Sequence, residues 1–168
     1  MIKYRELNYD KRYIDYNLLM QINKSFQVEY QNWWEENIKL GDIFNFHTIE
    51  QEDCEEGTIN HPIYRDCEIN QIRCVKEDNL GKNKEVFMDF VGDEILGLPT
   101  ITTLKEFIKY KTNLTIQETP YKNDCGVYGI NINLWNLEMK VVYKCFDGLS
   151  TNSLLAYLEV AEGLCENK

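Results

Sequence analysis

Hydrophobic and polar residues alternate along two neighbouring segments, residues 128–134 and 137–145. One face of the first segment carries Tyr128, Ile130, Ile132 and Leu134, and one face of the second carries Leu137, Met139, Val141, Tyr143 and Cys145. Alternation with a period of two is typical of strands that bury one face. The two segments therefore predict a β-hairpin that turns at Trp135-Asn136, where Asn136 tolerates the positive φ of a tight turn.

An amphipathic helix is predicted directly after this hairpin, over residues 151–164. Its apolar stripe repeats at intervals of three and four residues and consists of Leu154, Leu155, Leu158, Ala161 and Cys165. Ser150 or Thr151 can cap its first free backbone N–H groups. Because such a stripe needs an apolar cover, we expect the helix to pack on the hairpin.

Three more helices are predicted upstream, over residues 10–23, 25–39 and 102–111. Ser25 is the expected cap of the second helix, and Gly41 is its expected end. Thr102 or Thr103 is the expected cap of the third, and Thr103 with Glu106 has the spacing of a capping box.

Short strands are predicted at residues 67–75, 85–91 and 113–118, with loops at 119–124 and in the acidic segment 42–64. The fold class is therefore α+β: an antiparallel sheet of about four to five strands, two helices packed on it, and an N-terminal helical layer over 10–39. We divide the chain into a helical arm (1–41), an acidic loop with strands (42–98) and an α-β-β-β-α half (99–168), together one compact domain.

The element order of residues 99–165 resembles the double-stranded RNA-binding domain. That family contacts the RNA backbone through Lys residues at the start of its last helix. Here this helix begins STNSLLAYLE, and no Lys or Arg occurs from Phe146 to Asn167. The resemblance therefore does not imply RNA binding for this chain.

The same region also resembles small sandwich domains found in phage proteins. Their last helix begins with a Thr-led turn followed by Leu- and Ala-rich turns, as in Thr151–Leu164. This resemblance implies an origin in a phage or another mobile element, and it implies no particular chemistry.

The chain is strongly acidic, with 28 Asp and Glu against 18 Lys and Arg in 168 residues and a net charge of −10. Such a charge disfavours direct binding to nucleic acid and favours a protein partner with a basic surface, although acidity also serves solubility alone. No apolar run approaches the ~20 residues that span a bilayer, and the start MIKYRELNYDKRY has no apolar core. We therefore expect no membrane contact and a place in the host cell cytosol, where the six Cys are free thiols.

Two groups of residues are candidates for partner binding. The acidic candidates are Glu50, Glu52, Asp53, Glu55 and Glu56 in EQEDCEE, which is either a solvated loop or a phosphate-like patch for a basic groove. The aromatic candidates are Tyr13, Tyr16, Trp33 and Trp34. Neighbouring positions on a helix point about 100° apart, so the paired Trp rings are either both core residues or include one interface anchor.

The sequence contains no Walker A loop, GxGxxG, GxSxG or HExxH motif, so we predict no enzyme activity and no cofactor. One alternative is a metal site, for which the candidate ligands are His47, Cys54, His61, Cys67 and Cys74. None of these forms a tight CxxC-type pair, and inward-facing Cys67 and Cys74 are the simpler interpretation. Cys125 is a further candidate thiol, and Asp89 and the pair Asp93-Glu94 receive no role.

Together these features predict a small acidic binding protein that inhibits a larger, basic, nucleic-acid-binding host-defence enzyme by direct docking. A toxin-immunity protein is one alternative, and a zinc or thiol enzyme is another. A phage assembly protein is a third alternative; self-association, including a homodimer, would be its sign.

Overall fold

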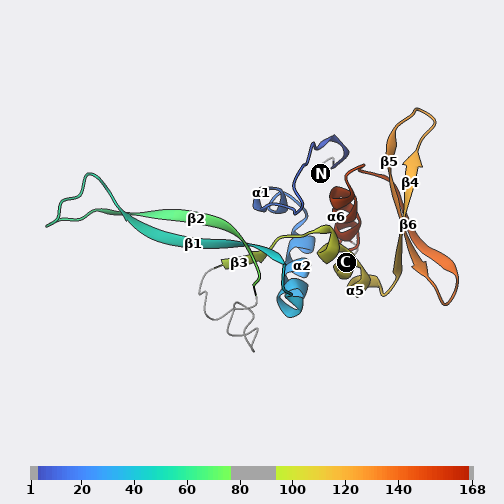
Figure 1. Ribbon diagram of the computed structural model, residues 1–168, viewed down its shortest axis with the longest axis horizontal. Helices are drawn as coiled ribbons and strands as arrows, with labels where there is room; N and C mark the ends of the chain where they lie inside the picture. Colours follow the sequence, from blue (N-terminus) through green and yellow to red (C-terminus); the bar gives the residue numbers. More distant parts are fainter. Residues whose placement is uncertain (1–3, 77–93, 167–168) are drawn as a thin grey trace. The chain divides into compact units, whose positions relative to one another are not determined.

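The computed structural model describes residues 4–76 and 94–166 and divides the chain into two compact units. The first unit combines residues 1–37 with 98–168, and the second consists of residues 38–97 (Figure 1). The predicted helical segment and the predicted α-β-β-β-α half thus contribute to one unit. The fold is α+β, with two three-stranded antiparallel sheets in the described residues instead of one larger sheet.

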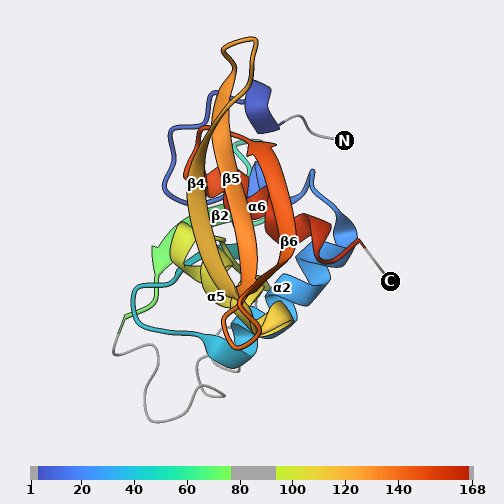
Figure 2. The ribbon, with the colours of Figure 1, turned by 90° about the vertical axis from the view of Figure 1, so that its right-hand side faces the viewer.

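The first unit is built on a sheet of β4 (Thr115–Lys122), β5 (Tyr128–Asn136) and β6 (Val141–Leu149), in that order. Along β5 the predicted alternation is confirmed for Ile130, Ile132 and Leu134, which are buried, but not for Tyr128, which is exposed. Helices α5 (Ile101–Thr112) and α6 (Ser153–Gly163) cover one face of the sheet (Figure 2). The predicted order α-β-β-β-α is confirmed.

The turn between β5 and β6 differs from the prediction. It spans residues 137–140, where the Asn136 side-chain oxygen accepts a hydrogen bond of 3.0 Å from the Met139 backbone N–H. β6 therefore begins at Val141, four residues later than expected. As a result the expected inward-facing residues are 45–74% exposed: Leu137, Met139, Val141 and Tyr143. Residues 119–122, predicted as a loop, extend β4.

Both covering helices begin at caps other than those predicted. Thr100 caps α5, and it exchanges backbone-to-side-chain hydrogen bonds of 3.2 and 2.8 Å with Thr103. Asn152 caps α6 by accepting a bond of 3.3 Å from the Leu155 N–H. Thr100, Thr102 and Thr103 stand at or near the start of α5, and Ser150, Thr151 and Asn152 precede α6. All of these residue types can cap a helix, so sequence alone did not select the right one.

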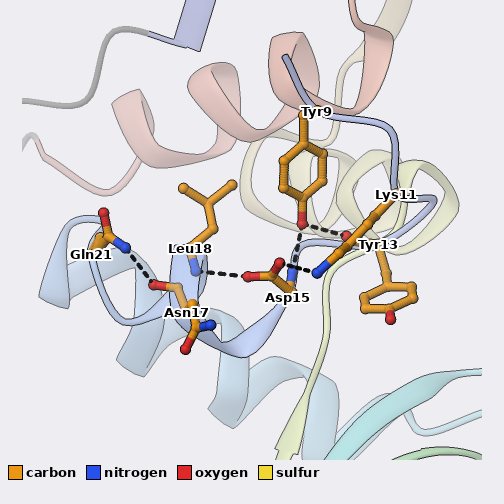
Figure 3. A network of polar contacts seen from close by, with 7 residues as sticks. All are labelled: Tyr9, Lys11, Tyr13, Asp15, Asn17, Leu18 and Gln21. Carbon is orange, nitrogen blue, oxygen red and sulfur yellow. Dashed lines mark hydrogen bonds and ion pairs between the residues drawn. The ribbon is translucent and has the colours of Figure 1, made fainter. Parts of the chain in front are cut away.

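The predicted helix over residues 10–23 is wrong, since α1 spans only Tyr16–Leu19. Figure 3 shows the contacts that replace it. The Tyr9 hydroxyl donates to the Tyr13 carbonyl and accepts from the Asp15 N–H, both at 2.8 Å. The Asp15 carboxylate caps α1 at the Leu18 N–H and accepts from Lys11 at 2.5 Å. These bonds hold residues 9–15 in an irregular conformation.

The N-terminal segment, with η1 (Tyr4–Glu6) and α2 (Lys24–Asn37), contributes to the core of the first unit. Glu162 of α6 accepts hydrogen bonds from the Tyr4 hydroxyl at 2.6 Å and from the Asn23 N–H at 2.8 Å. Aromatic rings of α2 pack on Phe107 of α5 at centroid distances of 5.5–5.8 Å: Phe26, Tyr30 and Trp33. The segment is therefore a packed layer and not a free arm.

The second unit contains β1 (Ile43–Asp53), β2 (Tyr64–Cys74) and β3 (Glu94–Gly97), in the order β2-β1-β3. The predicted strand 67–75 is confirmed as part of β2, whereas the predicted loop over 42–64 is wrong for residues 43–53. The predicted strand 85–91 and the carboxylates Asp89 and Asp93 lie outside the described residues. No helix in the described ranges is long and apolar enough to cross a lipid bilayer.

Candidate functional site

Strands β1 and β2 form a two-stranded ribbon that extends well beyond β3 (Figure 1). β3 pairs with β1 only from Phe44 to His47, whereas β1 and β2 stay paired as far as Asp53 and Tyr64. We call residues 49–68 the distal ribbon. Six residues at about 3.4 Å per residue separate His47 from Asp53, so among residues 4–76 and 94–166 the two strands continue without a third for about 20 Å.

The distal ribbon is strongly acidic. It contains one Lys or Arg, Arg65, and seven acidic side chains: Glu50, Glu52, Asp53, Glu55, Glu56, Asp66 and Glu68. In the observed register each strand acid faces a residue that is not an acid, for example Glu50 opposite Cys67 and Glu52 opposite Arg65. Like charges directly opposite destabilise a sheet. The register avoids such pairs, and the acids are therefore compatible with a strand.

Backbone hydrogen bonds close the turn between β1 and β2. The Cys54 N–H donates to the Ile63 carbonyl at 2.7 Å, and Thr58 and His61 exchange bonds of 3.0 and 3.1 Å. Gly57 is packed closely, because a Cβ atom there would lie 2.6 Å from the Ile63 nitrogen. The turn exposes Glu55 and Glu56 together with the fully exposed Ile59.

The register assigns the side chains of the ribbon to two faces, because directly opposite residues of antiparallel strands share a face. The Arg65 face carries Glu50, Glu52, Arg65 and Cys67 in the distal ribbon. Here Glu52 accepts hydrogen bonds from the Cys67 thiol at 3.1 Å and from Arg65 at 3.2 Å, and both lower the pKa of Glu52. The bond to Glu52 also raises the pKa of the Cys67 thiol.

The opposite face, which we call the Asp66 face, has a different chemistry. It carries Ile49, Gln51, Asp53, Tyr64, Asp66 and Glu68, and nearer β3 also Ile72. Asp66 accepts a bond of 3.3 Å from Gln51. No Lys or Arg occupies any β1 or β2 position on this face. Ile49, Tyr64 and Ile72 are 57%, 54% and 51% exposed.

All five acidic residues predicted as partner contacts are exposed and lie at the end of the ribbon: Glu50, Glu52, Asp53, Glu55 and Glu56. The structure brings them into one segment but not onto one face. Glu50 and Glu52 belong to the Arg65 face, Asp53 to the Asp66 face, and Glu55 and Glu56 to the turn.

The aromatic candidates are placed differently. Trp33 and Trp34 are 6% and 1% exposed, so of the two interpretations the structure supports the one in which both are core residues. Adjacent helical positions can both be buried here because α2 has buried residues on more than one side. Tyr13 and Tyr16 are half-buried, and the ring of Tyr13 points away from the hydrogen bonds around Tyr9 (Figure 3).

The candidate metal ligands do not converge. Cys67 and Cys74 are seven residues apart on β2, about 24 Å along an extended strand. His47 faces Asn70, between them in register, while Cys54 and His61 belong to the turn region. Within the described ranges no three His, Cys, Asp or Glu side chains are grouped as a metal site would require. Cys125 is exposed in the turn between β4 and β5, and both His residues belong to the other unit.

A cleft of about 490 Å³ lies between α2 and α5 in the first unit. It contains the ion pair of Glu29 with Lys111, and its lining is Glu29, Asn32, Trp33, Glu36, Phe107, Tyr110 and Lys111. None of these residues is a Cys or a His, the groups on which the thiol and zinc alternatives depend. The cleft therefore gives no support to an enzyme of the thiol or zinc type.

Sequence reasoning missed the residues of β2 that complete the ribbon, above all Tyr64, Asp66 and Glu68. The missing signal was the pairing of 43–53 with 64–74, which only becomes visible once the acidic segment is accepted as a strand. Comparison of the chain with protein-family models, with curated proteins and with solved structures finds no match. The site must therefore be interpreted from its own geometry.

Proposed function

We propose that this protein is a small acidic binding protein of a phage or mobile element that docks through its ribbon on a larger, basic, nucleic-acid-binding host-defence enzyme and inhibits it. The observation that supports this most is the distal ribbon, where five carboxylates and Arg65 lie on two strands, two more carboxylates lie in the turn, and no third strand pairs with this part among the described residues. A two-stranded hairpin alone is marginally stable in water. Exposed apolar side chains on such a hairpin are better explained by a partner than by folding.

Charge supports the same proposal. A protein of net charge −10 attracts a basic surface over a distance of about one Debye length, ~8 Å at physiological ionic strength. The carboxylates of the ribbon would occupy the surface on which the partner otherwise binds nucleic-acid phosphates. Inhibition then follows from competition, and it needs no catalytic group on this chain.

Affinity capture from a bacterial lysate, followed by an inhibition assay, tests this proposal. The bait is the full-length protein, and the matched control replaces residues 51–66 with Asn-Gly, a pair that favours a two-residue hairpin turn between Glu50 and Cys67. We expect the intact protein alone to retain a basic partner, with retention falling as salt rises. Added to that partner, the intact protein should displace its nucleic acid.

Equal capture by both baits, or a captured partner that still binds nucleic acid, would contradict the proposal. If the partner is instead a toxin whose activity stops on binding, the same surface would define an immunity protein.

A further inference from the structure

We propose that the partner contacts the Asp66 face of the ribbon, and that the partner's binding surface is a groove with an apolar floor and Lys or Arg side chains along its rim. This inference rests on the proposed function and adds which face binds and what chemistry it meets. The argument compares the two faces of the ribbon.

Side chains on the Arg65 face interact with one another. Glu52 accepts hydrogen bonds from Arg65 and Cys67. Nearer β3, the guanidinium of Arg73 covers the ring of Phe46 at 4.3 Å from its centroid. Arg65, Cys67 and Arg73 thus already interact with Glu52 and Phe46 on the same face. Fewer of the charged groups on this face remain available to a partner.

Side chains on the Asp66 face also bond to one another, since Gln51 donates to Asp66 at 3.3 Å and Asn45 donates to Asn70 at 3.0 Å, but these bonds involve no Lys or Arg. Exposed apolar residues recur at every fourth pair of the register, at Ile72 opposite Asn45, Ile49 opposite Glu68, and Tyr64 opposite Asp53. These pairs span eight residues, or about 27 Å along the strands. Acidic side chains lie in the two pairs farther from β3, as Glu68 and Asp53, and in the pair between those two, as Asp66. No Lys or Arg on this face of β1 and β2 neutralises them.

This pattern specifies the partner. Buried apolar and aromatic side chains usually supply most of the binding energy, and surrounding charges supply specificity and speed of association. If the partner's surface were suited only to nucleic-acid phosphates, Ile49, Tyr64 and Ile72 of this chain would be placed against polar groups of the partner. A groove about 27 Å long with an apolar floor and a basic rim matches both components.

Two short fluorescent peptides serve as probes, one of alternating Lys and Leu and one of alternating Lys and Ser. They are titrated with the full-length protein at low and at physiological ionic strength, and binding is measured by fluorescence anisotropy. The Lys-Leu peptide should bind more tightly. Ile49→Ser with Tyr64→Ser should remove this preference and leave binding of the Lys-Ser peptide unchanged.

Charge variants matched across the two faces test which face binds. Asp66→Asn with Glu68→Gln should weaken binding of either peptide at least about fivefold and flatten its salt dependence. Glu50→Gln with Glu52→Gln removes the same charge from the Arg65 face and should change binding less than about twofold. Asp66→Asn alone, which keeps the shape of the side chain, should weaken binding in the same direction. It serves as the test if the double variant is misfolded.

Equal effects of the two charge pairs, or equal affinity for the two peptides, would overturn the inference. The protein with residues 51–66 replaced by Asn-Gly separates this failure from that of the proposed function. If that protein loses peptide binding while the two faces behave alike, only the assignment of the face fails. If it binds both peptides as well as the intact protein, the ribbon is not the site and the proposed function fails as well.

Discussion

At the scale of single residues, Asp15 determines where α1 begins. Its carboxylate accepts hydrogen bonds from the Leu18 N–H and from Lys11. Burial opposes the charged form, but these two bonds outweigh it and lower the pKa of Asp15. We predict that Asp15→Ala destabilises the protein by about 1 kcal/mol in urea unfolding at neutral pH, and that Asp15→Asn, which keeps an acceptor, destabilises it less.

The pH dependence of this effect follows from the direction of the shift. A carboxyl with a lowered pKa stabilises the folded state above its unfolded pKa of about 3.9, and the stabilisation is lost as the pH falls through the folded pKa. The difference between the protein and Asp15→Ala should therefore shrink in acid. A difference that is constant with pH would contradict the role of the charge.

Glu159 on α6 has the opposite shift. Burial raises the pKa of this carboxyl, the nearby Arg5 counteracts the rise, and Glu162 adds to it. The charged form is thus disfavoured in the folded state, so Glu159→Gln should stabilise the protein at neutral pH. We expect less than about 1 kcal/mol because the side chain is half exposed. The gain should disappear below the unfolded pKa of about 4.3, and thermal unfolding at both pH values checks it.

At the scale of elements, the sequence correctly predicted the helices and strands whose hydrophobic periodicity matches the face that they bury in the fold. The period of two in β5 and the stripe of α6 correctly identified the covered face of the first sheet, because Ile130, Ile132 and Leu134 alternate with polar residues. The helix over 10–23 was predicted from a similar apolar pattern. It failed because side-chain bonds of Tyr9 and Asp15 compete with the helical backbone, an effect that periodicity does not report.

Of the candidate site, the sequence predicted the acidic character but not the strand structure. The acids of 50–56 led us to predict an interaction surface in a loop, and the loop is wrong for residues 50–53, which belong to β1. The acids of β1 repel one another less than their spacing in the sequence suggests, because the opposite strand places Arg65 and Cys67 beside Glu52 as hydrogen-bond donors. This information lies in the pairing of residues far apart in the chain, and no single segment contains it.

The hairpin of β5 and β6 offers a prediction at the same scale. Lys140 closes its turn with φ = 53°, a left-handed conformation that costs a residue with a Cβ atom about 1–2 kcal/mol. Lys140→Gly should therefore stabilise the hairpin by about 0.5–1 kcal/mol, after the added flexibility of the unfolded chain is subtracted. Lys144→Gly, within β6, is the control and should destabilise it. Chemical unfolding compares the two, and a loss of stability in Lys140→Gly would show that the turn is not strained.

At the scale of the whole molecule, the two units differ in how their side chains are covered. The first unit buries a continuous aromatic and aliphatic core that includes Trp33 and Trp34, whereas the distal ribbon exposes nearly every side chain. The proposed binding surface and the core of the first unit thus lie in different parts of the chain. A surface that need not contribute to the core is free to combine exposed Ile and Tyr with carboxylates.

Replacement of residues 51–66 by Asn-Gly tests this separation. All three Trp residues, including Trp135, belong to the first unit, so Trp fluorescence reports unfolding of that unit alone. We predict that the urea midpoint of the fluorescence transition changes by no more than the equivalent of about 0.5 kcal/mol, because changes at exposed positions usually have effects of this size. Trp33→Ala in the intact chain is the control and should cost about 3–5 kcal/mol. A large shift after replacement of 51–66 would mean that the distal ribbon supports the core, and the exposed apolar residues would then need an explanation within the fold.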